Sequence, residues 1–127
     1  MQTDDTILIV EDDAAIVSFM TDALSDEGYI VHAALDVASA LHALKAHQPG
    51  LVLLDLHLDG TVSTALLDHM RENGFTAIAM VLMTADAQLA ANLTTEGEYV
   101  CLLKPFDLDE LFACVARFLR PQSTPST

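Results

Sequence analysis

Short apolar segments alternate with longer amphipathic segments along the chain. Three of the apolar segments, ILIV, LVLL and AIAMVLM, are hydrophobic almost without interruption. Unbroken hydrophobicity over so few residues is typical of strands that are covered on both faces, as in a parallel sheet. The pattern predicts strands at Ile7–Val10, Tyr29–Ala34, Leu51–Leu54, Ala77–Met83 and Tyr99–Leu103.

The segments after these strands have hydrophobic residues at helical spacing, with capping residues at several ends. Asp36 is a good N-cap for the second helix, and Asp107 and Glu110 have the spacing of a capping box at the start of the fifth. The predicted helical stripes are Ile16–Leu24, Val37–Leu44, Val62–Met70, Ala85–Glu96 and Leu108–Leu119, and glycines follow three of them, at Gly28, Gly74 and Gly97.

The predicted order is therefore a strand and a helix repeated five times. Such alternation implies an α/β fold with a five-stranded parallel sheet, right-handed crossovers and helices on both faces. The 127 residues suit one domain, which we place at residues 1–120. The polar segment Pro121–Thr127 is rich in Pro, Ser and Thr, and we expect a disordered tail or linker there.

Composition narrows the possible partners and the setting. The chain has 19 acidic and 5 basic residues and a net charge of −14, which disfavours direct binding to nucleic acid. The two cysteines, Cys101 and Cys114, lack the spacing of a zinc site or a disulfide framework. No apolar run approaches the roughly 18 residues of a membrane span, and the N-terminus lacks the basic region of a signal peptide. We expect a cytoplasmic setting.

Polar residues follow four of the five predicted strands directly. Ligands of open α/β sheets bind beyond the carboxyl ends of the strands, so these residues are the candidates for chemistry. Each one alone has an ordinary explanation as a helix cap or surface charge, but together they place carboxylates, a hydroxyl and an ammonium at one edge. In strand order they are Glu11, Asp12 and Asp13, then Asp55, then Thr84, which Ala85 follows, and finally Lys104, which Pro105 follows.

The chemistry open to such a cluster is limited. Carboxylates held close together repel one another unless a hard cation such as Mg²⁺ neutralises them. A carboxylate is also a nucleophile toward phosphorus and forms an aspartyl phosphate. Metal, ammonium and hydroxyl groups stabilise the charge on a transferring phosphoryl group. Asp55, with Lys104, Thr84 and a metal ion, is a sufficient set for that transfer.

The motifs ILIVEDD, LVLLDLHL, VLMTA and LLKPF occur in this order, and with them the chain resembles the receiver domains of response regulators from about Ile7 to Leu119. The resemblance implies a flavodoxin-like (βα)5 fold with strand order 2-1-3-4-5. It also implies a signalling phosphoprotein of a two-component phosphorelay, not an enzyme with an external substrate. A histidine kinase or histidine phosphotransfer protein would donate the phosphoryl group. A downstream protein target or output domain would respond, and a homodimer through the fourth and fifth helices is compatible with the family.

The resemblance assigns the first group of roles around the phosphoryl acceptor. Asp55 matches the phosphoacceptor, and Glu11 and Asp12 match the acidic pair that binds Mg²⁺, for which Mn²⁺ can substitute. The backbone carbonyl of His57 matches the third protein ligand of the metal. Asp13 lies one residue beyond the metal pair and is interpreted as a helix-start residue.

A second group of roles concerns the transferred group and its lifetime. Thr84, Ala85 and Lys104 match the residues that contact the phosphoryl group, and the Lys104–Pro105 bond is expected to be cis. His57 and Asp86 occupy the two positions that tune phosphoryl lifetime in this family. The alternative is that both side chains simply face solvent.

Two places depart from the family pattern. Asp59 and Ser63, with Gly60 nearby, stand where receivers usually carry a proline and a glycine. Cys101 stands where receivers carry the aromatic switch residue. Tyr99 lies two residues earlier and therefore on the same side of the strand, so it either replaces the missing ring in part or is an ordinary aromatic of the strand.

Alternative functions remain open at this point. An aspartyl-nucleophile phosphatase or phosphotransferase typically has a second Asp two residues after the first, where this chain has His57. A flavin- or nucleotide-binding module needs a phosphate loop after the first strand, where this chain has EDDAA. A pseudo-receiver that only mediates interaction is the principal alternative, because of Cys101 and the altered loop. The other histidines, His32, His42, His47 and His69, show no ligand spacing with one another.

Overall fold

The computed structural model describes residues 5–58, 65–73, 78–95 and 99–119. Within these ranges strands and helices alternate as the hydrophobic pattern predicts, and no helix there is long and apolar enough to cross a membrane. The elements are β1 (Thr6–Val10), α1 (Ala14–Asp26), β2 (Ile30–Ala34), α2 (Val37–His47), β3 (Leu51–Asp55), α3 (Ala65–Glu72), β4 (Ala79–Thr84), α4 (Ala87–Thr95), β5 (Val100–Leu103) and α5 (Leu108–Ala116).

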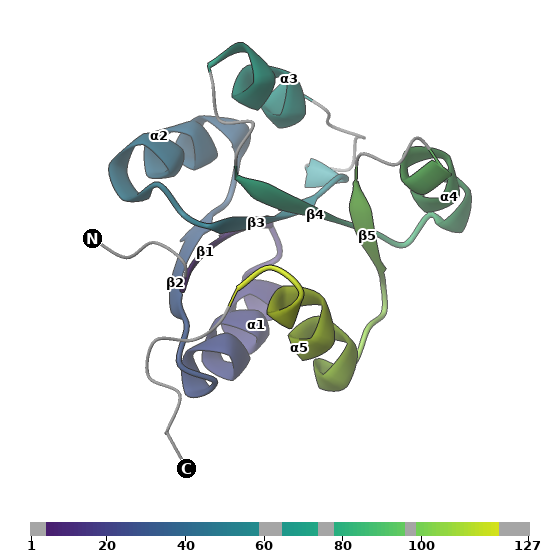
Figure 1. The fold of residues 1–127 in the computed structure, drawn as a ribbon, viewed down its shortest axis with the longest axis horizontal. Coiled ribbons are helices and arrows are strands. Elements are labelled where there is room, and N and C mark those ends of the chain that lie inside the picture. Colours follow the sequence, from purple (N-terminus) through teal and green to yellow (C-terminus); the bar gives the residue numbers. More distant parts are fainter. Residues whose placement is uncertain (1–4, 59–64, 74–77, 96–98, 120–127) are drawn as a thin grey trace.

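The five strands form one parallel sheet in the order β2-β1-β3-β4-β5. This confirms the parallel α/β architecture and the order implied by the resemblance. Helices α1 and α5 cover one face of the sheet, and α2, α3 and α4 cover the other (Figure 1). Every residue of β1 and β3 is buried, which is the reason for the unbroken hydrophobicity of these two segments.

A hydrophobic cluster lies on each face of the sheet. Successive side chains of a strand point to opposite faces, so β1 contributes to both clusters. Ile9 packs in the same cluster as Met20 of α1, whereas Leu8 packs in the same cluster as Leu44 of α2. The burial of these side chains fixes the register of β1, because a slip of one residue would exchange the two sets.

The predicted helix caps are confirmed. The Asp36 carboxylate accepts a hydrogen bond from the Ser39 backbone N–H at 2.7 Å. Asp107 and Glu110 form a reciprocal capping box at the start of α5, with distances of 3.0 and 2.8 Å. Gly28 follows α1 with a φ of 100°, a conformation that a residue with a Cβ adopts only at a cost.

Several element boundaries differ from the predicted ones. Strand β2 begins at Ile30 because Tyr29 is still bonded to the end of α1. Its N–H donates a hydrogen bond to the Leu24 carbonyl at 3.2 Å. Helix α4 begins at Ala87 because Asp86 caps it, its carboxylate accepting from the Leu89 N–H at 3.0 Å. The predictions that involve Asp59–Ser63, Gly74, Ala77, Gly97 and Pro121–Thr127 lie outside the described residues.

The structure brings together two histidines that the sequence did not connect. The rings of His32 in β2 and His47 at the end of α2 stack in parallel, with their centroids 3.6 Å apart and an interplanar angle of 10°. His42 lines the same shallow hollow. Burial lowers the pKa of His32, and the neighbouring charge of His47 lowers it further.

We expect this stack to make stability depend on pH. Because the pKa of His32 is lower in the folded protein than its ordinary 6.5, the unfolded chain binds a proton there first as pH falls. The free energy of unfolding should therefore decline as pH drops below about 6.5. In His32→Gln, urea unfolding at successive pH values should show a shallower decline. His69→Gln, at an exposed position of α3, should keep the full slope, and equal slopes in all three proteins would contradict the prediction.

Candidate functional site

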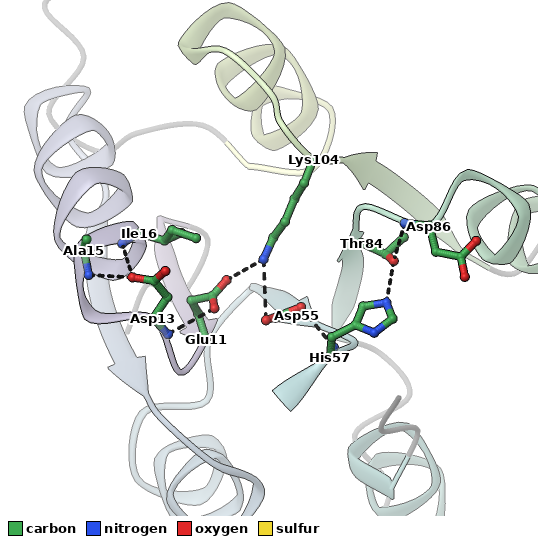
Figure 2. Close-up of polar contacts among 9 residues, drawn as sticks. All are labelled: Glu11, Asp13, Ala15, Ile16, Asp55, His57, Thr84, Asp86 and Lys104. Atoms are coloured by element: carbon green, nitrogen blue, oxygen red, sulfur yellow. Dashed lines mark hydrogen bonds and ion pairs between the residues drawn. The ribbon is translucent and has the colours of Figure 1, made fainter. Parts of the chain in front are cut away.

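The carboxyl ends of β1, β3, β4 and β5 bring the predicted polar residues to one edge of the sheet. Glu11 follows β1, Asp55 ends β3, Thr84 ends β4 and Lys104 follows β5. In the register of the sheet, Asp55 lies beside Met83 and Thr84 beside Leu103, so neighbouring strands end almost level. Figure 2 shows the resulting group of side chains around Asp55.

Three carboxylates converge at the centre of this edge. Glu11, Asp12 and Asp55 each offer an oxygen atom, and these atoms all lie within 4.8 Å of one another. Glu11 and Asp55 are only 1% and 3% exposed, whereas Asp12 is exposed to solvent. Two buried carboxylates and one exposed carboxylate facing one point form an oxygen donor set that suits a hard divalent cation retaining several waters, so the residues fit Mg²⁺.

Lys104 supplies the positive charge that the buried carboxylates need. Its Nζ donates a hydrogen bond to Glu11 Oε1 at 2.9 Å and lies 3.5 Å from Asp55 Oδ2 (Figure 2). Its backbone N–H donates to the Thr84 carbonyl at 2.8 Å, which extends the contact between β4 and β5 by one residue. The Lys104–Pro105 peptide bond is cis, as the resemblance implied.

The pKa values of the paired groups reflect this crowding. Burial raises the pKa of Glu11, the hydrogen bonds from Lys104 and Asp13 oppose that rise, and the charge of Asp55 adds to it. Burial alone would lower the pKa of Lys104, but Glu11 and Asp55 raise it above its ordinary value. Lys104 is therefore held as an ammonium, and this one ammonium pairs with both carboxylates.

Asp13 has the structural role expected of it. Its carboxylate accepts hydrogen bonds from the N–H groups of Ala15 and Ile16 at 2.9 and 3.3 Å, which makes it the N-cap of α1. Its own N–H donates to Glu11 Oε2 at 3.1 Å and so orients that carboxylate. The acidic run after β1 therefore divides into Glu11 and Asp12 at the carboxylate cluster and Asp13 at the helix start.

Thr84 and His57 form a contact that sequence reasoning missed. Thr84 Oγ1 lies 2.8 Å from His57 Nε2 and accepts a hydrogen bond from the Asp86 N–H at 3.0 Å (Figure 2). The His57 N–H donates to Asp55 Oδ1 at 3.0 Å. Thr84 is fully buried, His57 is half-buried, and Ala85 and Asp86 are exposed. Chain position alone gave no signal for this contact, because it depends on how far β3 and β4 extend beside each other.

The switch position is occupied by a thiol that faces α4. Cys101 is half-buried, and its Sγ contacts the Ala90 carbonyl of α4 at 3.8 Å. Tyr99 packs on the same hydrophobic cluster as Cys101, which agrees with their expected position on one side of the strand. The Tyr99 hydroxyl accepts a hydrogen bond from Arg71 of α3, and the guanidinium carbon lies 5.7 Å from the centre of the ring. Tyr99, directly before β5, thus contacts α3, while Cys101 within β5 contacts α4.

Comparison with known proteins agrees with this geometry. Residues 7–116 match the family model of the response regulator receiver domain. The regulatory protein AtoC of Escherichia coli strain K12 is 34% identical over 119 residues, which are 92% of this chain and 26% of that protein. The sporulation initiation phosphotransferase F of Bacillus subtilis strain 168 is 31% identical over 118 residues, which are 89% of this chain and 92% of that protein.

A solved structure shows the same fold. The receiver domain of NtrX from Brucella abortus superposes with a TM-score of 0.76 at 32% identity, over 87% of this chain and 95% of that one. The fold and site define a doubly wound α/β domain with an acidic centre at the carboxyl edge of its sheet. The chain belongs to the response regulator receiver domain family of two-component systems. It spans about a quarter of the length of AtoC.

We predict that the buried carboxylates depend on Lys104 for stability. In Lys104→Met, Glu11 and Asp55 lose their ammonium partner, and the free energy of unfolding without divalent cations should fall by about 1–3 kcal/mol. Urea unfolding in the presence of a metal chelator measures this loss of free energy, and added Mg²⁺ should restore part of it. Lys45→Met, at an exposed position of α2, is the matched control and should change little. Equal losses in the two variants would contradict the prediction.

Proposed function

We propose that this receiver domain accepts a phosphoryl group on Asp55. The observation that carries the proposal is the position of its carboxylate: it ends β3, is 3% exposed, and lies 3.5 Å from an ammonium and beside two further carboxylates. In the reaction, an Asp55 oxygen attacks phosphorus and the bond between phosphorus and the donor's histidine nitrogen breaks. The electron pair of that bond goes to the imidazole, which then takes up a proton.

The carboxylate cluster supports a divalent cation in this role. Glu11, Asp12 and Asp55 would hold Mg²⁺, with Mn²⁺ as a substitute, and the backbone carbonyl of His57 would complete the protein ligands. When bound, the cation neutralises the carboxylates and the charge of the incoming phosphoryl group. That neutralisation is needed because Lys104 alone faces several negative groups.

Lys104 and Thr84 supply the remaining contacts of the proposed site. The ammonium of Lys104 is already 3.5 Å from Asp55 and would pair with a phosphoryl oxygen there. Thr84 ends β4, one residue beyond the register partner of Asp55, and Ala85 follows it. Both would contact the phosphoryl group in the phosphorylated conformation. His57 and Asp86 flank these groups and would tune how long the phosphoryl group remains.

The geometry favours a phosphoacceptor over an enzyme that turns over an external phosphate ester. An aspartyl phosphatase would need a second acid two residues after the nucleophile. Here His57 occupies that place, and its imidazole contacts Thr84. We therefore propose that the domain accepts one phosphoryl group and releases it slowly to water. A pseudo-receiver without phosphorylation is the alternative, and the experiment below separates the two.

An apolar surface beside Lys104 suits a protein donor. Phe19 of α1 is 48% exposed and lines a hollow together with Ile16, Phe106 and the Lys104–Pro105 segment. Apolar surface that continues to a reactive centre is typical of a protein docking site. We propose that a histidine kinase or histidine phosphotransfer protein docks here to bring its phosphohistidine to Asp55.

The partners downstream of the domain are also proposals. Among the relatives, AtoC is about four times longer than the matched region, whereas sporulation initiation phosphotransferase F is matched over almost its whole length. Either an output domain or a separate protein target is therefore compatible with the family. We propose a cytoplasmic signalling role without direct nucleic-acid binding, in keeping with the net charge of −14. A homodimer through α4 and α5 is a separate proposal, which rests on the resemblance to the family.

Acetyl phosphate provides the direct test of phosphorylation. Incubation with Mg²⁺ should give a single adduct of about 80 Da by intact mass, the size of one phosphoryl group. Asp55→Ala should abolish the adduct, and Asp22→Ala, at an exposed position of α1, should retain it. An adduct that persists in Asp55→Ala, or none in the unsubstituted protein, would overturn the proposal, and the latter result would favour the pseudo-receiver.

The proposed metal site can be tested without phosphorylation. At a Mg²⁺ concentration about 100 times the Kd, binding to the folded state should raise the free energy of unfolding by about 2.7 kcal/mol. Asp12→Asn should lose most of this gain, because it removes a charged ligand of the cluster. Asp13→Asn makes the same chemical change one residue later and keeps a good N-cap, so it should retain the gain. Urea unfolding with and without Mg²⁺ measures both, and an equal gain in both variants would exclude Asp12 as a ligand.

A further inference from the structure

The imidazole of His57 is directed toward the end of β4. Figure 2 shows the ring pointing toward Thr84, and its Nε2 lies 2.8 Å from Thr84 Oγ1. Thr84 is fully buried and His57 is half-buried, so the contact is largely removed from water. Leaving a buried hydroxyl without a hydrogen-bond partner costs more free energy than the hydrogen bond contributes, on balance, to stability.

The hydrogen-bonding capacity of the Thr84 hydroxyl is limited. A hydroxyl donates once and accepts at two lone pairs, and the Asp86 N–H already occupies one lone pair at 3.0 Å. If His57 Nε2 lacks a proton, it accepts the single hydrogen bond that the Thr84 hydroxyl can donate. If it carries a proton, it fills the second lone pair. In both tautomers the imidazole holds the hydroxyl at its present place.

His57 also contacts the phosphoacceptor directly. Its backbone N–H donates to Asp55 Oδ1 at 3.0 Å, while its side chain holds Thr84. One residue thus joins the carboxylate to be phosphorylated and the hydroxyl expected to recognise the phosphoryl group.

We propose that His57 is a positioning residue that holds the Thr84 hydroxyl in the unphosphorylated conformation, and that Thr84 leaves the imidazole when it contacts the phosphoryl group. The inference rests on the proposed function, because it needs a phosphoryl group on Asp55. It goes further in assigning a specific competitor for the hydroxyl. When Nε2 lacks a proton, the imidazole and a phosphoryl oxygen both accept from the single hydroxyl proton of Thr84, so they are alternative partners of one buried group. A change of partner shifts the population between two conformations.

The proposal predicts the direction of a substitution effect. Removal of the imidazole destabilises only the conformation in which Thr84 contacts it, so the phosphoryl-bound conformation becomes easier to reach. Beryllofluoride, a mimic of the phosphoryl group, should then bind more tightly to His57→Ala. The expected change in Kd is about threefold to tenfold, the effect of losing one hydrogen bond of ordinary net strength. If His57 instead changed the lifetime of the phosphoryl group by controlling the access of water, the effect of His57→Ala would not depend on the Thr84 hydroxyl.

The test is a double-mutant cycle read by calorimetry at saturating Mg²⁺. The cycle comprises the unsubstituted protein, His57→Ala, Thr84→Ala and the double variant, each checked for folding by circular dichroism. His57→Gln is added because its side-chain amide reaches about as far as Nε2 and its amide oxygen can accept a hydrogen bond from the Thr84 hydroxyl. Asp55→Asn shows whether beryllofluoride binds at the proposed acceptor.

The expected result has three parts. His57→Ala tightens beryllofluoride binding, His57→Gln restores the unsubstituted affinity, and His57→Ala has no effect when Thr84 is already Ala. Unchanged or weaker binding in His57→Ala, equal tightening in His57→Gln, or tightening that persists without the Thr84 hydroxyl would overturn the inference. If the unsubstituted protein fails to bind beryllofluoride, or binds it equally in Asp55→Asn, the proposed function itself fails. These two failures are distinguishable.

Discussion

Two buried carboxylates share one ammonium at the carboxyl edge of the sheet, and the arrangement around them depends on this shared charge. Glu11 and Asp55 approach each other because β1 and β3 are neighbours, and Lys104 reaches both from the end of β5. One ammonium only partly compensates two carboxylates in a poorly solvated place. The edge therefore keeps a negative charge that a further cation would neutralise.

The fold keeps this charged edge fixed through its apolar strands. The fully buried side chains of β1 and β3 pack against helices on both faces, so the strand ends cannot shift independently. The caps at Asp13 and Asp86 then start α1 and α4 directly beside the site. The backbone N–H groups of the same two residues donate to Glu11 and Thr84, so the helix starts and the site geometry are linked.

The contacts around the switch position differ from the usual pattern of the family. Cys101 replaces the expected ring and contacts α4, while Tyr99 reaches Arg71 of α3. The side chain that holds the Thr84 hydroxyl belongs to His57, two residues after the acceptor. Asp55 is thus joined to Thr84 through His57, while Cys101 and Tyr99 contact α4 and α3.

The sequence by itself determined the fold class and the composition of the site. Hydrophobic runs with their caps predicted the strands and helices of the described residues to within a few residues, because local burial and capping act over short distances along the chain. The convergence of Glu11, Asp55, Thr84 and Lys104 was predictable, because parallel strands present their carboxyl ends at one edge. The family motifs then supplied the strand order and the cis bond before Pro105.

Only the tertiary structure decided which of these side chains touch. The contact of His57 with Thr84, the stack of His32 on His47 and the link from Tyr99 to Arg71 each join residues from different elements. Their formation depends on strand register, helix position and rotamer, and none of these is encoded in the spacing of two residues along the chain. The sequence identified the groups available for phosphoryl chemistry, and the packing of the sheet and its helices decided how each group is held.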